Sequence, residues 1–410
     1  MISRALLRRP VLAACALVAL LTWSVYHPAA AVDDEVSVLE HRYPLLFQHV
    51  HTNSGNGGAW YIPRSWTTDT PGGIVEAAQV ALRAANSSVE RHIPHSNIPL
   101  IVHQTWKNTR TDTWPPAIRR STEKWLRAID GKTAYMLWDD EGVAQLIQRF
   151  EPELEEQFFA LRPVERADVF RVLVSKWIGG VYADMDTEPL RAPTDWVSET
   201  DVLPWRDPET GRVYTSTAPV NAIVGIEADC PPDSDTYWRM GYLHPVQLTQ
   251  WAFAWAPGHP ILQAFVDRLS AQLKLIKDHH GGWQSQSARR ELHSLDPIAL
   301  TGPGAVTQST QSWLESKVGL RWNALSGLQD NGTSKLVADV LVLPITGFSP
   351  GRGGYGNMGS KPIMDPSARL LHRAQGSWRA FDLRVEYGKF CRTMLGRCRD
   401  WSKVPQSLLD

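Results

Sequence analysis

The chain has 410 residues, of which 43% are hydrophobic, and a formal net charge of −1 at pH 7. This length suits one large domain or two modest ones with a real core. The near-neutral balance excludes a protein that holds nucleic acid by electrostatic attraction, because such proteins carry a surplus of basic residues. Eighteen tryptophans are a heavy load, which indicates either ordinary packing or platforms on which sugars stack.

The N-terminal region predicts a membrane anchor. Arg4, Arg8 and Arg9 precede an apolar run at residues 11–25, and acidic residues follow it. Because positive charge stays on the cytosolic side, we expect a cytosolic tail at 1–10, a signal-anchor transmembrane helix at 11–26 and the rest of the chain in the lumen. Ala29-Ala30-Ala31 also fits a signal-peptidase site, so a cleaved signal peptide is the alternative.

Beyond the anchor, residues 27–96 contain no motif that carries chemistry, and we expect them to form a luminal stem. The main globular domain is expected at 97–380 and a C-terminal tail at 381–410. Sequons for N-glycosylation at Asn86 and Asn331 agree with a secretory route. In the tail, Cys391 and Cys398 are close enough in sequence either to form a disulfide or to stay free.

Two apolar segments, at 100–102 and 133–138, predict buried strands. The first leads into His103-Gln104-Thr105-Trp106. Ligands of doubly wound α/β folds gather at the carboxyl ends of strands, so His103 and Trp106 are candidates for contact with a nucleotide. A hydrogen-bonded structural role is the alternative for His103. The acids at 139–141 follow the second strand and are typical of a helix N-terminus.

The most informative stretch runs from Arg166 to Thr187. Apolar residues at helical spacing are followed by Gly179-Gly180, a short strand at 181–183 and the acids Asp184 and Asp186. Positions two apart on a strand point the same way, so both carboxylates can converge on Mn²⁺ or Mg²⁺. A polar turn without metal is the alternative. Asp168 and Arg171 share a helix face, where the arginine can bind phosphate or pair with the aspartate.

Later segments add further candidates. A strand expected at 220–226 leads to Glu227 and Asp229, which are placed either to reach a sugar hydroxyl or to serve structure alone. The helix expected at 261–275 precedes a polar loop with His279 and His280, whose adjacency is poor spacing for chelation. Residues 349–359 are rich in glycine and indicate a lid or a plain flexible loop. His372, six residues before Trp378, is placed either to turn back towards a metal or a diphosphate or to serve structure alone.

In this order the motifs resemble glycosyltransferase family 32. The resemblance covers about residues 97 to 380 and rests above all on R-A-D-x-x-R at 166–171, G-G-x-Y-x-D-x-D at 179–186 and H-x-x-x-G-x-W at 372–378. It implies an α/β, GT-A-type fold, a Rossmann-like mixed sheet flanked by helices, behind the membrane anchor. It also implies retaining, Mn²⁺-dependent (or Mg²⁺-dependent) transfer of mannose from GDP-mannose to an N-glycan core in α-1,6 linkage. The implied location is the Golgi membrane, with a mannosyltransferase complex as an open option.

The resemblance and the motifs together assign roles to individual residues. Metal ligands are expected to be Asp184, Asp186 and His372. Contacts with the sugar nucleotide are expected from His103, Trp106, Asp168, Arg171, Asp184 and His372. Arg171 is expected to stabilise charge during transfer, while Glu227 and Asp229 are the candidates for acting on the sugar or the acceptor.

Three other interpretations stay open. An enzyme of the same family that mannosylates inositol phosphoryl-ceramide would have a similar core, but we favour the glycan acceptor because of the segments 225–229 and 258–260. A non-catalytic mannan-binding subunit is the alternative from another class. A glycosidase is the third. It needs two carboxylates that flank the scissile bond, whereas Asp184 and Asp186, separated by one residue, suit chelation better.

Overall fold

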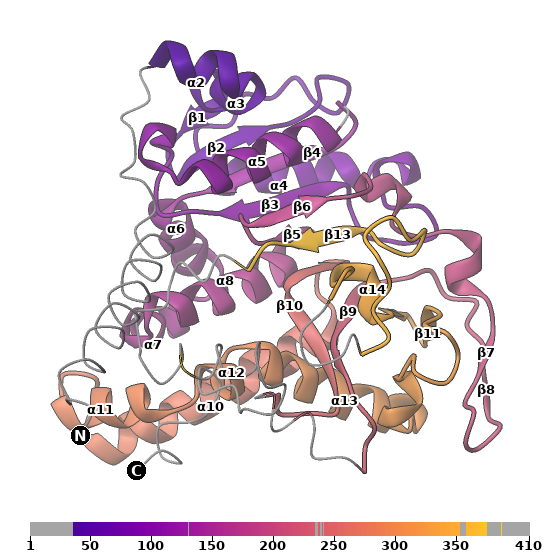
Figure 1. Ribbon diagram of the computed structural model, residues 1–410. Coiled ribbons are helices and arrows are strands. Elements are labelled where there is room, and N and C mark those ends of the chain that lie inside the picture. Colours follow the sequence, from indigo (N-terminus) through magenta and orange to yellow (C-terminus); the bar gives the residue numbers. More distant parts are fainter. Residues whose placement is uncertain are drawn as a thin grey trace, which may run out of the picture.

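The computed structural model describes residues 36–374 and Tyr387, apart from residues 130, 234–236, 238, 239, 241 and 353–357. The described part is built around a nine-stranded mixed sheet (Figure 1). From one edge to the other its strands are β1 (Ser54–Gly55), β2 (Gly58–Tyr61), β4 (Ala134–Trp138), β3 (Ile101–Thr105), β5 (Gly180–Ala183), β10 (Val246–Trp255), β9 (Ala222–Asp229), β12 (Val340–Leu343) and β11 (Lys335–Val337).

Strand direction determines where a site can form. β3 is parallel to both β4 and β5, and β12 is parallel to β9. β10 runs antiparallel between β5 and β9. As a result β3, β5 and β9 run in the same direction, and their carboxyl ends lie at the same end of the sheet. All five residues of β4 and all eight of β9 are buried, as expected for strands covered on both faces.

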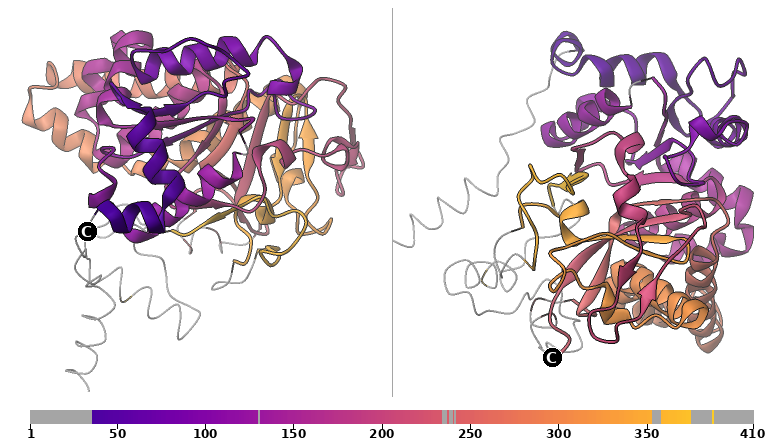
Figure 2. Two further views of the ribbon diagram at one scale, coloured as in Figure 1. Left: turned by 90° about the horizontal axis from the view of Figure 1, so that it is seen from above. Right: turned by 90° about the vertical axis from the view of Figure 1, so that its right-hand side faces the viewer.

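Helices cover the sheet on both faces, and the two views in Figure 2 show the sheet between them. One face carries α4 (Ile74–Ala85), α6 (Asp140–Phe150), α8 (Pro163–Trp177), α10 (Pro260–His280) and α13 (Pro303–Val318), which pack in sequence against one another. The other face carries α3 (Pro44–Asn53), α5 (Pro116–Ala128), α14 (Ile345–Phe348) and a two-stranded sheet of β6 (Thr187–Pro189) and β13 (Leu370–His372).

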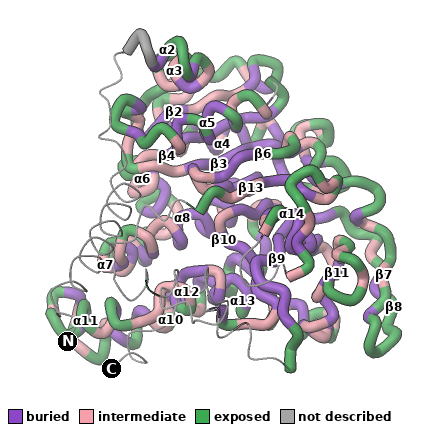
Figure 3. The backbone as a smooth tube through the Cα atoms, viewed as in Figure 1, coloured by how far each residue is buried: buried purple, intermediate pink, exposed green. Residues whose placement is uncertain are grey.

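The remaining elements are peripheral. They are α2 (Val36–Arg42), α7 (Glu155–Ala160), α11 (Gln286–Ser294), α12 (Pro297–Leu300), the hairpin of β7 (Trp205–Arg206) and β8 (Val213–Tyr214), and the 3-10 turns at Val89–Arg91, Thr111–Thr113, Pro152–Leu154, Pro193–Asp195, Glu199–Val202 and Trp322–Leu325. Figure 3 shows that burial is concentrated in the central strands and the inner sides of the helices. Asp139 caps α6 as predicted, since its Oδ1 accepts the Gly142 N–H at 2.9 Å.

The stem prediction is wrong for the described residues 36–96. β2 pairs with β4 from Gly58–Trp138 to Tyr61–Tyr135, so this segment forms part of the central sheet. In α4, Ile74, Ala77, Ala78 and Ala81 are fully buried. The apolar face of a single helix and a four-residue strand give a weak periodic signal, which explains why the sequence suggested a stem.

Several sequence predictions lie outside the described residues. These are the cytosolic tail at 1–10, the anchor at 11–26, the Gly376 and Trp378 positions, the Cys391–Cys398 pair and most of the tail at 381–410. Within the described ranges, no helix combines the length and the apolar character needed to cross a membrane. The described cysteine, Cys230, is buried and makes no disulfide.

Candidate active site

The candidate site begins where β5 ends, at the end of the sheet where the carboxyl ends of β3 and β5 lie. Gly179 (φ +74°) and Gly180 (φ +95°) link α8 to this strand, in a conformation that favours glycine. After Ala183, the chain turns sharply: the Thr187 N–H and its hydroxyl both bond to the carbonyl of Asp184, at 3.0 and 2.6 Å. The two aspartates therefore converge through a turn, and not through strand alternation as the sequence suggested.

A second strand brings His372 to the same place. β13 pairs antiparallel with β6, and His372 lies opposite Thr187. Its Nε2 is 3.3 Å from Oδ1 of Asp186, and the Arg373 N–H bonds to the Asp186 carbonyl at 2.9 Å. Asp184, Asp186 and His372 thus present ligand atoms that all lie within 4.8 Å of one another.

Helix α8 contributes a buried ion-pair network beside these three residues. Arg171 Nη2 lies 3.1 Å from Oδ1 of Asp184 and 3.3 Å from Oδ1 of Asp168. The Tyr182 hydroxyl also donates to Asp184 Oδ1, at 2.8 Å. Asp168 is held further by the Thr301 hydroxyl, 3.1 Å from its Oδ2. The predicted pairing of Asp168 with Arg171 therefore exists, and the structure extends it to Asp184.

The carboxylates of this network are crowded in a buried place. Burial raises the pKa of Asp168 to about 7, although Arg171 beside it acts in the opposite direction. Burial also raises the pKa of Asp184, with Arg171 opposing and Asp186 reinforcing the shift. For Arg171, burial alone would lower the pKa, but the carboxylates around it raise it overall. The site therefore holds more negative charge than one guanidinium balances.

This donor set fits a hard divalent cation. Two carboxylates and one imidazole can supply three ligands, which leaves positions of an octahedral ion for water and for substrate phosphates. Oxygen ligands suit Mg²⁺ and Mn²⁺, and the imidazole is compatible with a first-row transition ion such as Mn²⁺. A bound cation would also relieve the repulsion between Asp184 and Asp186.

Trp251, on β10, is a further residue of the site that no local sequence motif indicated. Its ring stacks on that of His372, and its carbonyl accepts the Asp184 N–H at 2.8 Å. The indole Nε1 is buried and has no hydrogen-bond partner among the described residues. Trp251 comes from an antiparallel strand about 65 residues after the aspartates, so no local spacing in the sequence could have linked it to them.

One predicted site residue belongs to the core. His103 is fully buried, its Nε2 bonds to the Gly179 carbonyl at 2.9 Å, and its Nδ1 accepts the Trp138 indole N–H at 3.1 Å. Both ring nitrogens are therefore used, so the predicted contact with a nucleotide is wrong and the structural alternative is right. Trp106, three residues later, is half-buried at the carboxyl end of β3, at the same end of the sheet as Asp184.

The two acids of β9 differ from each other. Asp229 is buried, with Oδ1 accepting the Ser326 hydroxyl at 2.6 Å and Oδ2 accepting the Gly327 N–H at 2.8 Å. Both of its oxygens are engaged in holding the 326–327 turn, which speaks against the predicted role in transfer. Glu227 is buried near the same end of the strand, and its carbonyl accepts a hydrogen bond from Arg352.

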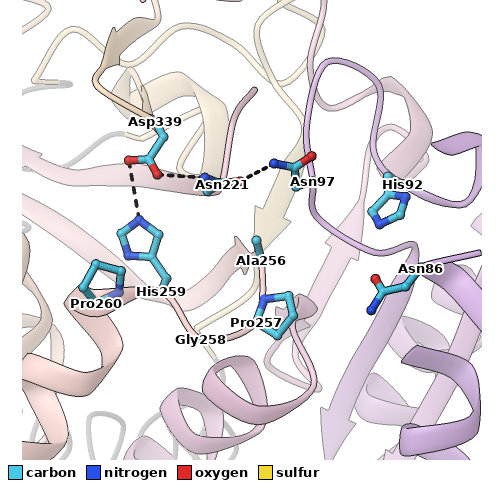
Figure 4. A pocket seen from close by; sticks show the side chains of 10 residues that line it. All are labelled: Asn86, His92, Asn97, Asn221, Ala256, Pro257, Gly258, His259, Pro260 and Asp339. Carbon is cyan, nitrogen blue, oxygen red and sulfur yellow. Dashed lines mark hydrogen bonds and ion pairs between the residues drawn. The ribbon is translucent and has the colours of Figure 1, made fainter. Parts of the chain in front are cut away.

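A polar pocket lies at the opposite end of the sheet, away from the carboxyl ends of β3, β5 and β9 (Figure 4). There His259 caps α10, with its Nδ1 accepting the Ile261 N–H, and its Nε2 is 3.6 Å from Asp339. Asn221 links Asp339 to Asn97 by hydrogen bonds of 2.8 and 2.9 Å. These bonds tie together the strand ends away from Asp184. The segment 258–260, which helped us to favour a glycan acceptor, is therefore remote from the candidate site.

Known proteins agree with the class that this site indicates. Residues 115–203 match the family described as "Glycosyltransferase sugar-binding region containing DXD motif", and Asp184-Met185-Asp186 lies within the match. The fold and the DXD cluster thus define a glycosyltransferase.

Comparison with individual relatives narrows the class to a family. The chain is 32% identical over 311 residues to the initiation-specific alpha-1,6-mannosyltransferase of Schizosaccharomyces pombe, covering 74% of this chain and 70% of the relative. It is 26% identical over 300 residues to the Candida albicans protein of the same name, covering 68% and 72%. Inositol phosphoceramide mannosyltransferase 3 of S. pombe is 33% identical over 129 residues, covering 27% and 33%. The chain belongs to glycosyltransferase family 32, which confirms the resemblance noted from its motifs.

Proposed function

We propose that this enzyme transfers mannose from GDP-mannose to the core of an N-glycan in α-1,6 linkage, with retention of configuration and with Mn²⁺ as its metal. The observation that carries the proposal is the convergence of Asp184, Asp186 and His372 beside the buried Arg171. We assign the mixed sheet to the GT-A type, in which a nucleotide sugar binds at the carboxyl ends of the central strands.

The residues of the site would share the work as follows. Asp184, Asp186 and His372 would hold the cation, which supplies Lewis-acid stabilisation of the leaving diphosphate. Arg171 is fixed by Asp168, Asp184 and the Gln250 carbonyl, so it would add positive charge at a fixed position. Asp168 would orient the donor sugar through its carboxyl group. Trp106, half-buried at the end of β3, offers a ring face to the nucleotide base.

The extent of similarity supports the glycan acceptor. Similarity to the initiation-specific enzymes spans 68–74% of the chain, whereas similarity to inositol phosphoceramide mannosyltransferase 3 spans 27%. The shared part of the second group need not include the acceptor site. Transfer to inositol phosphoceramide remains the rival outcome of the experiment below.

We also propose that the enzyme is a single-pass type II protein of the Golgi membrane with its catalytic domain in the lumen. The charge pattern around residues 11–26 supports this, as do the exposed sequons at Asn86 and Asn331. Protease protection in sealed microsomes tests it. Cleavage of the catalytic domain without detergent would contradict a luminal location.

The full-length enzyme should be incubated with a panel of nucleotide sugars, with and without Mn²⁺, and offered both a defined high-mannose glycan and inositol phosphoceramide. We expect an α-1,6-linked mannose on the glycan, from GDP-mannose, and loss of activity with EDTA. Asp186→Asn should abolish transfer, because it removes a ligand at nearly constant volume. Mannose on the lipid would reassign the acceptor, and undiminished transfer by Asp186→Asn would refute the metal site.

A further inference from the structure

The end of α10 and the start of α11 form a helical corner that lies outside the candidate active site. α10 ends at His280, because Gly281 and Gly282 adopt φ values of +71° and +125° and turn the chain back. Trp283 is buried beneath this corner, and Arg289 donates to its carbonyl at 3.0 Å. Ala288 and Leu292 anchor the inner face of α11. The backbone positions of the corner are therefore well defined.

Three ligand-type side chains converge at this corner. His279 and His280 end α10, which extends beyond the expected 261–275 and includes the residues predicted to lie in a loop. Their rings are 4.5 Å apart. Glu291 reaches them from α11, with Oε2 2.5 Å from His280 Nε2 and 3.6 Å from His279 Nδ1. One ligand atom from each residue lies within 4.8 Å of the other two. The adjacency of His279 and His280 in sequence spoke against chelation by these two residues alone. Glu291, from another helix, adds the third ligand.

The surroundings complete the pattern of a metal site. The Ser287 hydroxyl lies 2.9 Å from Nδ1 of His280, which leaves Nε2 of that ring facing the carboxylate. Outer hydrogen bonds of this kind fix the orientation of ligating histidines. His279 is 73% exposed, so an ion can enter from solvent and keep a water as its fourth ligand.

We propose that His279, His280 and Glu291 bind Zn²⁺ and that the ion joins the end of α10 to the middle of α11. Two imidazoles and one carboxylate are a ligand set that zinc uses in tetrahedral sites. The set is poorer in oxygen than that of Asp184, Asp186 and His372, so the two sites should differ in preference, with Mn²⁺ favoured by the second. The proposal does not depend on the proposed transferase function.

The test is calorimetric titration of Zn²⁺ into the metal-free full-length chain, comparing the wild type with His280→Ala, Glu291→Gln and His293→Ala. His293 is an exposed histidine of the same helix that is not part of the cluster, which makes it the matched control. We expect the first two variants to bind zinc at least tenfold more weakly and His293→Ala to bind as the wild type does. The double variant Asp184→Asn/Asp186→Asn should keep the zinc affinity.

Two further measurements separate this site from others. Co²⁺ in place of Zn²⁺ should give the visible absorption of a tetrahedral site in the wild type but not in His280→Ala. Zinc should raise the unfolding temperature of the wild type and of His293→Ala but not of Glu291→Gln, whereas all four metal-free chains should unfold alike. Absence of zinc binding in the wild type, or equal binding by all four chains, would overturn the proposal.

Discussion

The indole ring of Trp251 lies flat against the imidazole of His372, with ring centroids 4.5 Å apart and planes 16° from parallel. His372 lies on β13, a three-residue strand near the end of the described chain. Its side chain therefore needs support from the central sheet. The carbonyl of the same tryptophan fixes the Asp184 backbone. One residue therefore positions two of the three candidate metal ligands.

This relationship predicts distinct effects of two substitutions. Trp251→Phe should keep the stacking, whereas Trp251→Leu should remove about 1 kcal/mol of aromatic contact, which corresponds to about fivefold weaker Mn²⁺ binding. Both variants remove the indole N–H, so a rise in KM for the donor in Trp251→Phe, which keeps the stacking, would assign the N–H to substrate. Titration of Mn²⁺ and steady-state kinetics separate these effects.

Trp205 provides the control for stacking. Its ring lies against that of Tyr214 at 4.5 Å and 11°, in the hairpin β7–β8 away from the site. Trp205→Leu should leave the Mn²⁺ affinity unchanged. Equal weakening by Trp205→Leu and Trp251→Leu would show that the stack on His372 has no specific role.

Removal of Arg171 should destabilise the metal-free protein. Arg171→Met leaves Asp168 and Asp184 buried without their shared cation, and breaking a buried ion pair typically costs about 3–5 kcal/mol. Mn²⁺ should restore part of this loss, since it supplies positive charge beside Asp184. Urea unfolding with and without Mn²⁺ measures both effects. A variant as stable as the wild type without metal would contradict the network.

Stability should fall with acidification because of His103. Burial lowers the pKa of His103 from 6.5 to about 4, and only the Gly179 carbonyl acts against this. The unfolded chain therefore binds a proton between pH 6.5 and 4 that the folded chain does not, so the free energy of unfolding decreases as the pH falls through this window. The full effect is about 3 kcal/mol.

The comparison of His103→Gln with the wild type isolates this contribution. Glutamine can donate to Gly179 and accept from Trp138, yet does not titrate. We expect a flatter dependence of unfolding free energy on pH between 6.5 and 4 in the variant, with the remaining slope due partly to His49, whose pKa burial also lowers to about 4. Parallel curves for the two proteins would contradict the burial of a neutral His103.

Gly180 should be intolerant of a side chain. A Cβ there would collide with the carbonyl of Ile101 on the neighbouring strand, and the φ of +95° is strained for other residues. Gly180→Ala should destabilise the fold by about 2 kcal/mol or more and displace β5, and with it Asp184. Gly72→Ala is the control, because a Cβ there would meet only Glu76 at 3.6 Å. Thermal unfolding distinguishes the two, and equal stability would refute the close approach.

Local patterns predicted the centre of this protein well. The helix, glycine pair, short strand and acids between Arg166 and Thr187 are adjacent in sequence, so their order carried the geometry of α8 and β5. The same reasoning failed for His103. Whether the side chain of a strand residue lies in the core or reaches the ligand site at the carboxyl ends of the strands depends on the neighbouring strands. It also failed for residues 36–96, whose pairing partner β4 lies about 75 residues further along the chain.

The pairing of β13 with β6 has a consequence for the order in which the enzyme matures. Asp184 and Asp186 are synthesised almost 190 residues before His372, which reaches them only when Leu370–His372 aligns with Thr187–Pro189. A growing polypeptide can therefore build most of the central sheet while its aspartates still lack their imidazole. Competence for metal would be acquired only after residue 372 has been made.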